Sequence, residues 1–157
     1  MVDVSGKPRT DRTATAAAVV RMSVALRARL VARELPKGDA IAVVRIAAIS
    51  GTKETSRLLP LCHPIGLTGV TVHVEPEGDD AIRIEVTTRC SGETGVEMEA
   101  MTGAAVGALA LYDMLKGIER DVRIDSIALL HKAGGRSGEW RAPHGTTAPR
   151  STDEAAP

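Results

Sequence analysis

Residues 92–116 constrain the fold of this chain most, because they predict one long helix that is apolar for much of its length. Acidic residues stand near the start of this helix and an Asp-Met-Leu-Lys segment stands near its end. We expect the helix to cover Val96–Glu119 and to pack against a core. An unpaired charge is costly to bury, so the ionisable groups on this helix need partners or a function.

Two of these groups, Asp113 and Lys116, are three residues apart and therefore lie on one face of the helix. A carboxylate beside an ammonium changes the pKa of both groups. The pair is thus either an acid/base pair of an active site or an ordinary helix ion pair, and the spacing alone leaves both interpretations open.

The two ends of the helix lie too far apart for one small molecule. Met98 and Glu99 precede Asp113 by about 14–15 residues, or about 21–23 Å of helix rise. If both ends are functional, they serve different sites or one composite site built from two chains. This favours an oligomer with active sites at subunit interfaces.

Composition excludes several classes of partner. The chain has 157 residues, enough for one domain but cramped for two. Its 20 basic and 20 acidic residues cancel, so no overall field attracts nucleic acid or an anionic membrane. One Trp, one Tyr and no Phe exclude a stacking platform for bases. The core must consist of Ala, Val, Leu, Ile and Met.

The chain shows no signal for secretion or membrane insertion. Its first residues lack the apolar segment of a signal peptide, and no run approaches the ~20 apolar residues of a membrane span. Cys62 and Cys90 form no Cys-x-x-Cys pair. We therefore expect a soluble cytoplasmic protein.

Local patterns predict alternating helices and strands. The expected elements are a strand Ala14–Met22, a helix Val24–Glu34 capped by Ser23, a helix Ala40–Ser50 capped by Asp39 and interrupted by Gly51, a short helix before Pro60, strands Thr68–Glu75 and Ala81–Cys90 in an antiparallel hairpin, and a last strand within Val122–Leu130. Helices and antiparallel strands in this order predict an α+β, ferredoxin-like two-layer fold, with the helices packed on one face of the sheet. We expect a single catalytic domain over residues 1–141, with an irregular arm at 1–12, and a disordered tail at 142–157.

The segment Leu59–Pro64 is the most unusual loop. His63 precedes a proline, which restricts its backbone, so it could present its imidazole rigidly to a ligand. A buried Cys62 and a hydrogen-bonded His63 at a loop corner are the plain alternative. Metal binding needs three or four ligands, whereas this adjacent pair offers two, and we expect no metal site.

Cations are spread along the chain as candidate anion ligands. They are Lys37, Lys53, Lys116, Lys132 and Arg136. The glycine-rich segment 134–138 could turn backbone N–H groups toward a phosphate, with Lys132 and Arg136 adding charge. It lacks the spacing of a P-loop, and a plain turn is the alternative.

Several of these segments closely resemble the MoaC family of molybdenum-cofactor biosynthesis, the cyclic pyranopterin monophosphate synthases. The segments that carry the resemblance are Met1–Ser5, Lys37–Asp39, Leu61–Pro64, Thr94–Ala100, Tyr112–Lys116 and Lys132–Gly138. They occur in the same order and spacing and span about residues 1–140. The rival interpretations are a non-catalytic nucleotide- or pterin-binding module, which would lack Asp113 or Lys116, and a metal-binding regulatory protein.

The resemblance implies a ferredoxin-like homohexamer, a trimer of dimers with sites near the dimer interfaces. It implies a lyase whose substrate is a cyclic dihydroguanosine triphosphate in which ribose C3′ is joined to purine C8. The products would be cyclic pyranopterin monophosphate and diphosphate. No cofactor is required by this resemblance, although Mg²⁺ can accompany the triphosphate.

The resemblance also implies roles for individual residues. Asp113 and Lys116 match the catalytic aspartate and lysine, and the sequence does not divide acid from base between them. The matching substrate-binding positions are Leu61, Cys62, His63, Met98, Glu99, Lys37 and Lys132, with Arg136 in place of a common Lys. Glu97 lies ~200° around the helix from Glu99, so we expect Glu99 to face the ligand and Glu97 to face solvent or an interface. Glu93 stands where many relatives carry Lys, and Leu115 where many carry Cys.

Overall fold

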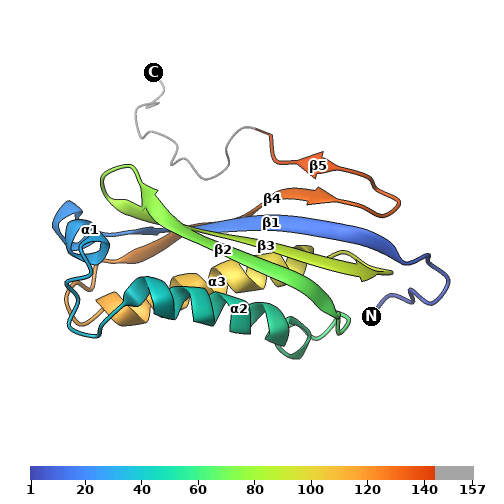
Figure 1. Cartoon of the computed structure of the whole chain (residues 1–157), viewed down its shortest axis with the longest axis horizontal. Coiled ribbons are helices and arrows are strands. Elements are labelled where there is room, and N and C mark those ends of the chain that lie inside the picture. The colour runs from blue at the N-terminus through green and yellow to red at the C-terminus, as the bar shows by residue number, and fades with distance from the viewer. Residues whose placement is uncertain (144–157) are drawn as a thin grey trace, which may run out of the picture.

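A five-stranded antiparallel sheet forms one layer of the molecule, and the computed structural model describes residues 1–143 (Figure 1). The strand order is β2-β3-β1-β4-β5. The strands are β1 Thr10–Arg21, β2 Leu67–Glu77, β3 Ala81–Gly92, β4 Arg123–Ala133 and β5 Trp140–Arg141. The succession β1, α2, β2, β3, α3, β4 with this strand order is a ferredoxin-like arrangement, so the predicted fold class is confirmed.

Three helices complete the fold of residues 1–143: α1 Val24–Val31, α2 Ala40–Leu58 and α3 Glu97–Leu115. Figure 1 shows α2 and α3 side by side beneath the sheet and α1 at one end of it. The Ser23 hydroxyl accepts a hydrogen bond from the Leu26 N–H at 3.2 Å, and the Asp39 carboxylate accepts one from the Ala42 N–H at 3.1 Å. Both predicted N-caps are therefore confirmed.

Small side chains let α3 approach its neighbours closely. Alanines at alternate positions of β1 are fully buried in the same core as the alanines of α3; they are Ala14, Ala16 and Ala18 on the strand and Ala100, Ala104 and Ala108 on the helix. A Cβ added at Gly103 would lie 2.6 Å from the Thr52 Cγ2 atom. Close approach of small residues fills the core without large aromatic side chains.

The prediction that Gly51 interrupts the second helix is wrong. Residues 40–58 form one continuous helix, and no separate short helix precedes Pro60. An added Cβ at Gly51 would lie 2.7 Å from the Val106 Cβ atom of α3. Glycine weakens a helix by about 1 kcal/mol, but here its missing side chain allows α2 and α3 to pack together, and that packing decides the structure.

We therefore expect Gly51→Ala to destabilise the protein by about 1–3 kcal/mol, because overpacking outweighs the gain in helix propensity. Urea unfolding followed by circular dichroism measures this. Gly117→Ala is the matched control, since nothing lies within 4 Å of the added Cβ, and its stability should change by less than about 0.5 kcal/mol. An equal or higher stability of Gly51→Ala would contradict the packing argument.

The ends of several elements differ from prediction; α1 ends at Val31 and α3 at Leu115, earlier than the expected Glu34 and Glu119. β1 begins at Thr10, so the irregular arm covers residues 1–9; β4 continues to Ala133, and β5 was not predicted. The expected disordered tail, 142–157, lies outside the described residues except for its first two, and the Ala142 N–H donates to the Leu130 carbonyl at 2.8 Å. Among helices of the described residues, none is long and apolar enough to cross a membrane.

Candidate active site

Three segments distant in sequence meet at the N-terminal end of α3. The loop that follows α2 carries Leu61, Cys62 and His63, and the turn Glu93–Val96 leads from β3 into the helix. Together with the N-terminal arm they enclose a cavity of about 340 Å³. Its lining includes five of the predicted substrate-binding residues, namely Leu61, Cys62, His63, Met98 and Glu99.

Glu99 is the most buried ionisable group of this cavity, with 3% of its surface exposed. Burial raises the pKa of its carboxyl, a hydrogen bond from its own backbone N–H opposes the shift, and the nearby Glu97 charge adds to it. The Cys62 pKa is raised as well, first by burial and then by Glu99. The site therefore holds a carboxyl group that keeps its proton to higher pH than an ordinary glutamate does.

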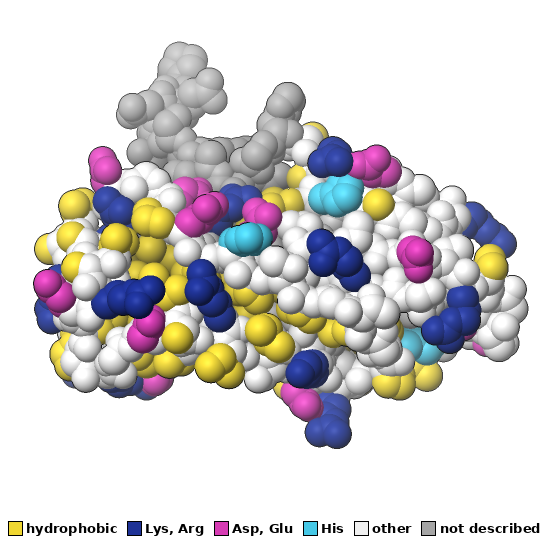
Figure 2. All heavy atoms as spheres, in the orientation of Figure 1, with side chains coloured by type: hydrophobic (Ala, Val, Ile, Leu, Met, Phe, Trp, Pro, Cys, Tyr) yellow, Lys and Arg dark blue, Asp and Glu magenta, His cyan; other side chains and the backbone are white. Residues whose placement is uncertain are grey.

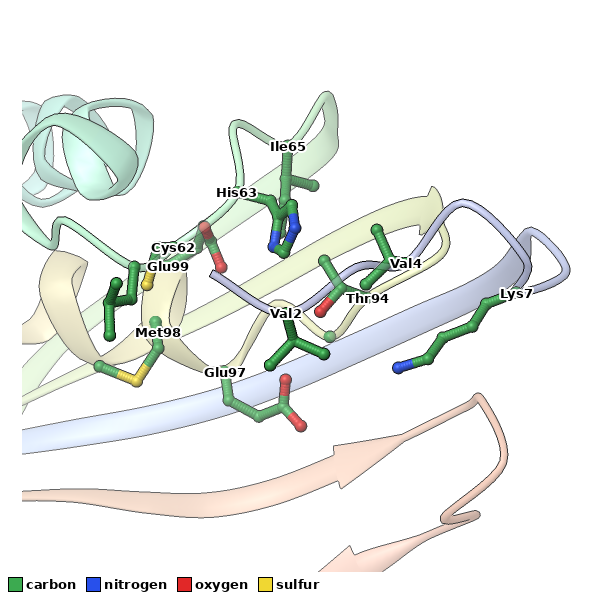
Figure 3. A pocket seen from close by; sticks show the side chains of 12 residues that line it. Val2, Val4, Lys7, Cys62, His63, Ile65, Thr94, Glu97, Met98 and Glu99 are labelled. Atoms are coloured by element: carbon green, nitrogen blue, oxygen red, sulfur yellow. The ribbon is translucent and has the colours of Figure 1, made fainter.

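Glu97 differs from expectation, because it also lines this cavity. Figure 3 shows the Glu97 and Glu99 side chains pointing in different directions. The cavity wraps around the end of the helix, so positions ~200° apart can both reach it. Glu97 forms an ion pair with Lys132 at 3.4 Å and lines a second cavity as well.

A raised carboxyl pKa predicts a pH-dependent stability effect. Because folded Glu99 keeps its proton to higher pH than the unfolded chain does, stability falls as pH rises above the unfolded pKa of about 4.3. Glu99→Gln removes this penalty, so we expect it to stabilise the fold at pH 8 by roughly 1 kcal/mol.

Urea unfolding at pH 8 and at pH 4 measures the difference in the free energy of unfolding between Glu99→Gln and the wild type. This difference should be smaller at pH 4. Glu75→Gln, an exposed carboxylate of β2, serves as the control and should show little change at either pH. A Glu99→Gln variant that is less stable than the wild type at pH 8 would refute the interpretation.

A second cavity, of about 620 Å³, adjoins the first and is rich in cations. The two share Lys7 and Glu97 among their lining residues. The basic residues of the second cavity are Lys7, Arg12, Lys132 and Arg136. Such a concentration of positive charge is suited to a polyanion.

The glycine-rich loop between β4 and β5 forms one wall of this second cavity. Gly134, Gly135 and Gly138 have φ values of 97°, 72° and 65°, which favour glycine. A Cβ at Gly135 would lie 2.1 Å from a terminal nitrogen of Arg12. The Lys132 ammonium donates to the Ser137 hydroxyl across the loop at 2.7 Å. The loop thus brings Lys132, Arg136 and Arg12 to one cavity.

Lys7 and Arg12 were missed in the sequence. Arg12 lies near the start of a strand, where a basic side chain has no distinctive pattern. Its guanidinium donates to the Gly92 and Glu93 carbonyls at 3.0 and 3.1 Å. Lys7 lies two residues after Met1–Ser5, a segment that carries the family resemblance. Its closeness to that segment was the signal that could have identified it.

The opposite end of α3 carries a separate cluster of charges. The Asp113 carboxylate accepts from the Lys116 ammonium at 2.7 Å and from the Lys37 ammonium at 3.0 Å. Lys37, in the turn between α1 and α2, also donates to the Asp113 carbonyl at 2.6 Å. The structure therefore brings together three of the predicted site residues, in a cluster that lies on the surface.

Mutual attraction sets the protonation of this cluster. The Asp113 pKa is lowered, first by Lys116 and then by Lys37, and the Lys116 pKa is raised by Asp113. The side chains of Asp113 and Lys116 are 57% and 53% exposed, so burial does not tune this pair within one subunit. At neutral pH Asp113 is a carboxylate and Lys116 an ammonium.

The two groups of site residues stay apart within one chain. From Glu99 to Asp113 the unbroken helix rises about 21 Å. Lys53, the remaining candidate cation, is exposed on α2 and lines neither cavity. In residues 1–143, no group of three or more His, Cys, Asp and Glu side chains is placed to hold a metal ion.

Comparison with known families places the chain in one of them. Residues 1–135 match the sequence model of the MoaC family. The chain belongs to the MoaC family. Membership of the MoaC family makes this protein an enzyme of molybdenum-cofactor biosynthesis. The matched residues include the N-terminal arm, the loop after α2 and helix α3, which line the cavities. They also include every site residue predicted from the sequence except Arg136.

Proposed function

We propose that this MoaC-family chain is a cyclic pyranopterin monophosphate synthase, a lyase. Its substrate would be the cyclic dihydroguanosine triphosphate in which ribose C3′ is joined to purine C8, and its products cyclic pyranopterin monophosphate and diphosphate. The observation that carries the proposal is the charge cluster of Lys37, Asp113 and Lys116, which lies exposed at the surface of a family enzyme.

Opening the imidazole ring of the purine and closing the pterin ring require proton donors and acceptors. Lys116 is the proposed proton donor, and the Asp113 carboxylate raises its pKa and so keeps it protonated in the free enzyme. Asp113, whose pKa is lowered, remains a carboxylate that orients the two ammonium groups beside it. Glu99 and His63 would hold the base portion in the smaller cavity, where polar groups of the aminopyrimidine can meet a largely buried carboxyl.

Closing a sugar oxygen onto the α-phosphate releases diphosphate, which leaves with the electrons of the broken P–O bond. Cations lower the energy of this step by neutralising the developing charge. Lys132, Arg136 and Arg12 line the larger cavity and supply that charge. The proposal needs no resident cofactor, and Mg²⁺ would enter bound to the triphosphate as part of the substrate.

The active site is proposed to be composite, because Asp113 and Lys116 lie about 21 Å from Glu99 along the helix. A second copy, packed with its α3 reversed, would bring its charge cluster to the cavities of the first. Large apolar side chains exposed on the helical layer support such packing; they are Val43, Ile46 and Leu58 of α2 and Met98 and Leu109 of α3. Figure 2 shows hydrophobic side chains on this part of the surface. A homohexamer built from such dimers is the proposed assembly.

The deciding experiment supplies the purified protein with the cyclic triphosphate and measures pterin product and diphosphate together. Both should form in equal amounts. Diphosphate without pterin, or no turnover, would refute the synthase. Binding of the cyclic triphosphate without turnover would instead support a nucleotide- or pterin-binding module.

A further inference from the structure

The N-terminal arm, residues 1–9, forms part of the wall of the substrate cavity. Val2, Val4 and Lys7 all line the smaller cavity, and Lys7 lines the larger one as well. Figure 3 shows the arm crossing the cavity, with Val2 between His63 and Glu97 in this view. A ligand that enters the smaller cavity must therefore contact the arm or displace it.

Few bonds hold this arm in place. Within the described residues, the hydrogen bonds of residues 1–8 join these residues only to each other: Ser5 donates to the Asp3 carboxylate, and the Lys7 N–H donates to the Val4 carbonyl at 3.0 Å. Val2 is 73% exposed and Val4 is only partly buried, so burial adds a modest contribution. The arm is thus free to leave the cavity at small cost.

Arg9 is where the arm is fastened to the body of the protein. Its guanidinium donates to the Ser91 carbonyl at 2.7 Å and forms an ion pair with the Glu93 carboxylate at 3.5 Å. Glu93 itself lines the larger cavity. An unpaired carboxylate there would repel a phosphate, so Arg9 both fastens the arm and neutralises this charge.

Lys7 and Arg136 are the cations of the larger cavity whose side chains have no hydrogen bond or ion pair to another described residue, and of these two only Lys7 belongs to the arm. Arg12 donates to backbone carbonyls and Lys132 is held by Ser137 and Glu97. The Lys7 ammonium has no hydrogen bond or ion pair to another residue of the described chain. An anion in the cavity would give it one, and the arm would move with it.

We propose that residues 1–9 are a strap that closes over the phosphates of the substrate, with Lys7 as their contact and the Arg9–Glu93 ion pair as the clasp that positions it. This rests on the proposed function for the identity of the polyphosphate. Arg9 and Glu93 are positioning residues, and they act on the reaction through Lys7.

The first test measures amide hydrogen exchange of residues 2–9 in the full chain, over the first seconds, with and without inorganic triphosphate as the probe. Triphosphate should slow exchange in the wild type, and Lys7→Gln should abolish most of that protection. Lys53→Gln, an exposed lysine outside both cavities, is the control and should keep it. No protection of the wild-type arm would overturn the strap.

The second test uses steady-state kinetics on variants of the clasp. Arg9→Gln should raise KM by about three- to fivefold, as expected for loss of an exposed ion pair, and leave kcat within about twofold. Glu93→Gln should have a smaller effect, because it leaves no unpaired carboxylate in the cavity. The exchanged pair, Arg9→Glu with Glu93→Arg, restores the ion pair with its charges reversed. Its KM should therefore be close to the wild-type value.

The outcomes separate the strap from the proposed function. Suppose that the wild type turns over substrate. The clasp is then refuted if Arg9→Gln leaves KM unchanged, or if it lowers kcat and the unfolding midpoint together. In both cases the proposed function stands. If the wild type shows no turnover, the function fails, while protection of the arm by inorganic triphosphate still decides whether the strap exists.

Discussion

Lys116→Ala and Asp113→Asn are each expected to lower turnover of the cyclic triphosphate by about 10²–10⁴-fold, the range for loss of a general acid or base. The Asp113 carboxylate lies between the ammonium groups of Lys116 and Lys37. Asn keeps the shape of the side chain but removes its charge, so neither lysine retains its carboxylate partner. Lys116→Ala removes the proposed proton donor.

The fold should survive both substitutions, because the two side chains are more than half exposed and exposed ion pairs contribute little stability. Single-turnover kinetics measures the chemical step, and urea unfolding verifies that stability changes by less than about 1 kcal/mol. Lys53→Ala, an exposed lysine on α2, should retain full activity. Near-normal rates for Lys116→Ala would remove this residue from the chemistry.

Mixing a Lys116→Ala variant with a Glu99→Ala variant, each expected to have little activity alone, is expected to restore activity if each site is built from two chains. A Lys116→Ala subunit keeps an intact cavity around Glu99, and a Glu99→Ala subunit keeps an intact charge cluster. In randomly mixed two-fold dimers, half of the dimers contain both variants, and one of their two sites is fully wild type. About one quarter of all sites in the random mixture should then be active, and about half of the sites in dimers that are selected for both variants.

The experiment coexpresses the two variants with different affinity tags, purifies the doubly tagged assembly and measures turnover per subunit. Each variant purified alone gives the background, and coexpression of one variant with itself under both tags is the matched control. Activity equal to the sum of the two backgrounds would show that the residues act within one chain or in separate sites. A monomer with full activity would likewise show that one chain forms the whole site.

Local patterns predicted those elements whose stability depends on near neighbours in the chain. The capping residues Ser23 and Asp39 marked the starts of α1 and α2, since their side chains bond to N–H groups three residues ahead. The alternation in Ala81–Cys90 marked β3 because side-chain period follows from backbone geometry. Both signals are contained within a few residues.

The errors arose where distant residues meet. Gly51 resembles a helix end until Val106 of α3 is packed against it. Glu97 was expected to face solvent or an interface, and it lines the cavity as well because the loop after α2 and the arm extend the cavity around the helix end. Arg12 gave no signal because its role depends on the glycine-rich loop more than 120 residues later in the chain.

The sequence by itself determined the α+β fold class, the long helix with functional groups at both ends, and the separation of those ends, because each follows from the periodicity and rise of regular backbone. Only the tertiary structure decided which cations share a cavity, that Glu99 is buried while Asp113 is exposed, and that Arg9 and Glu93 fasten the arm. Exposure and charge pairing depend on which surfaces meet, and these surfaces come from segments far apart in the chain.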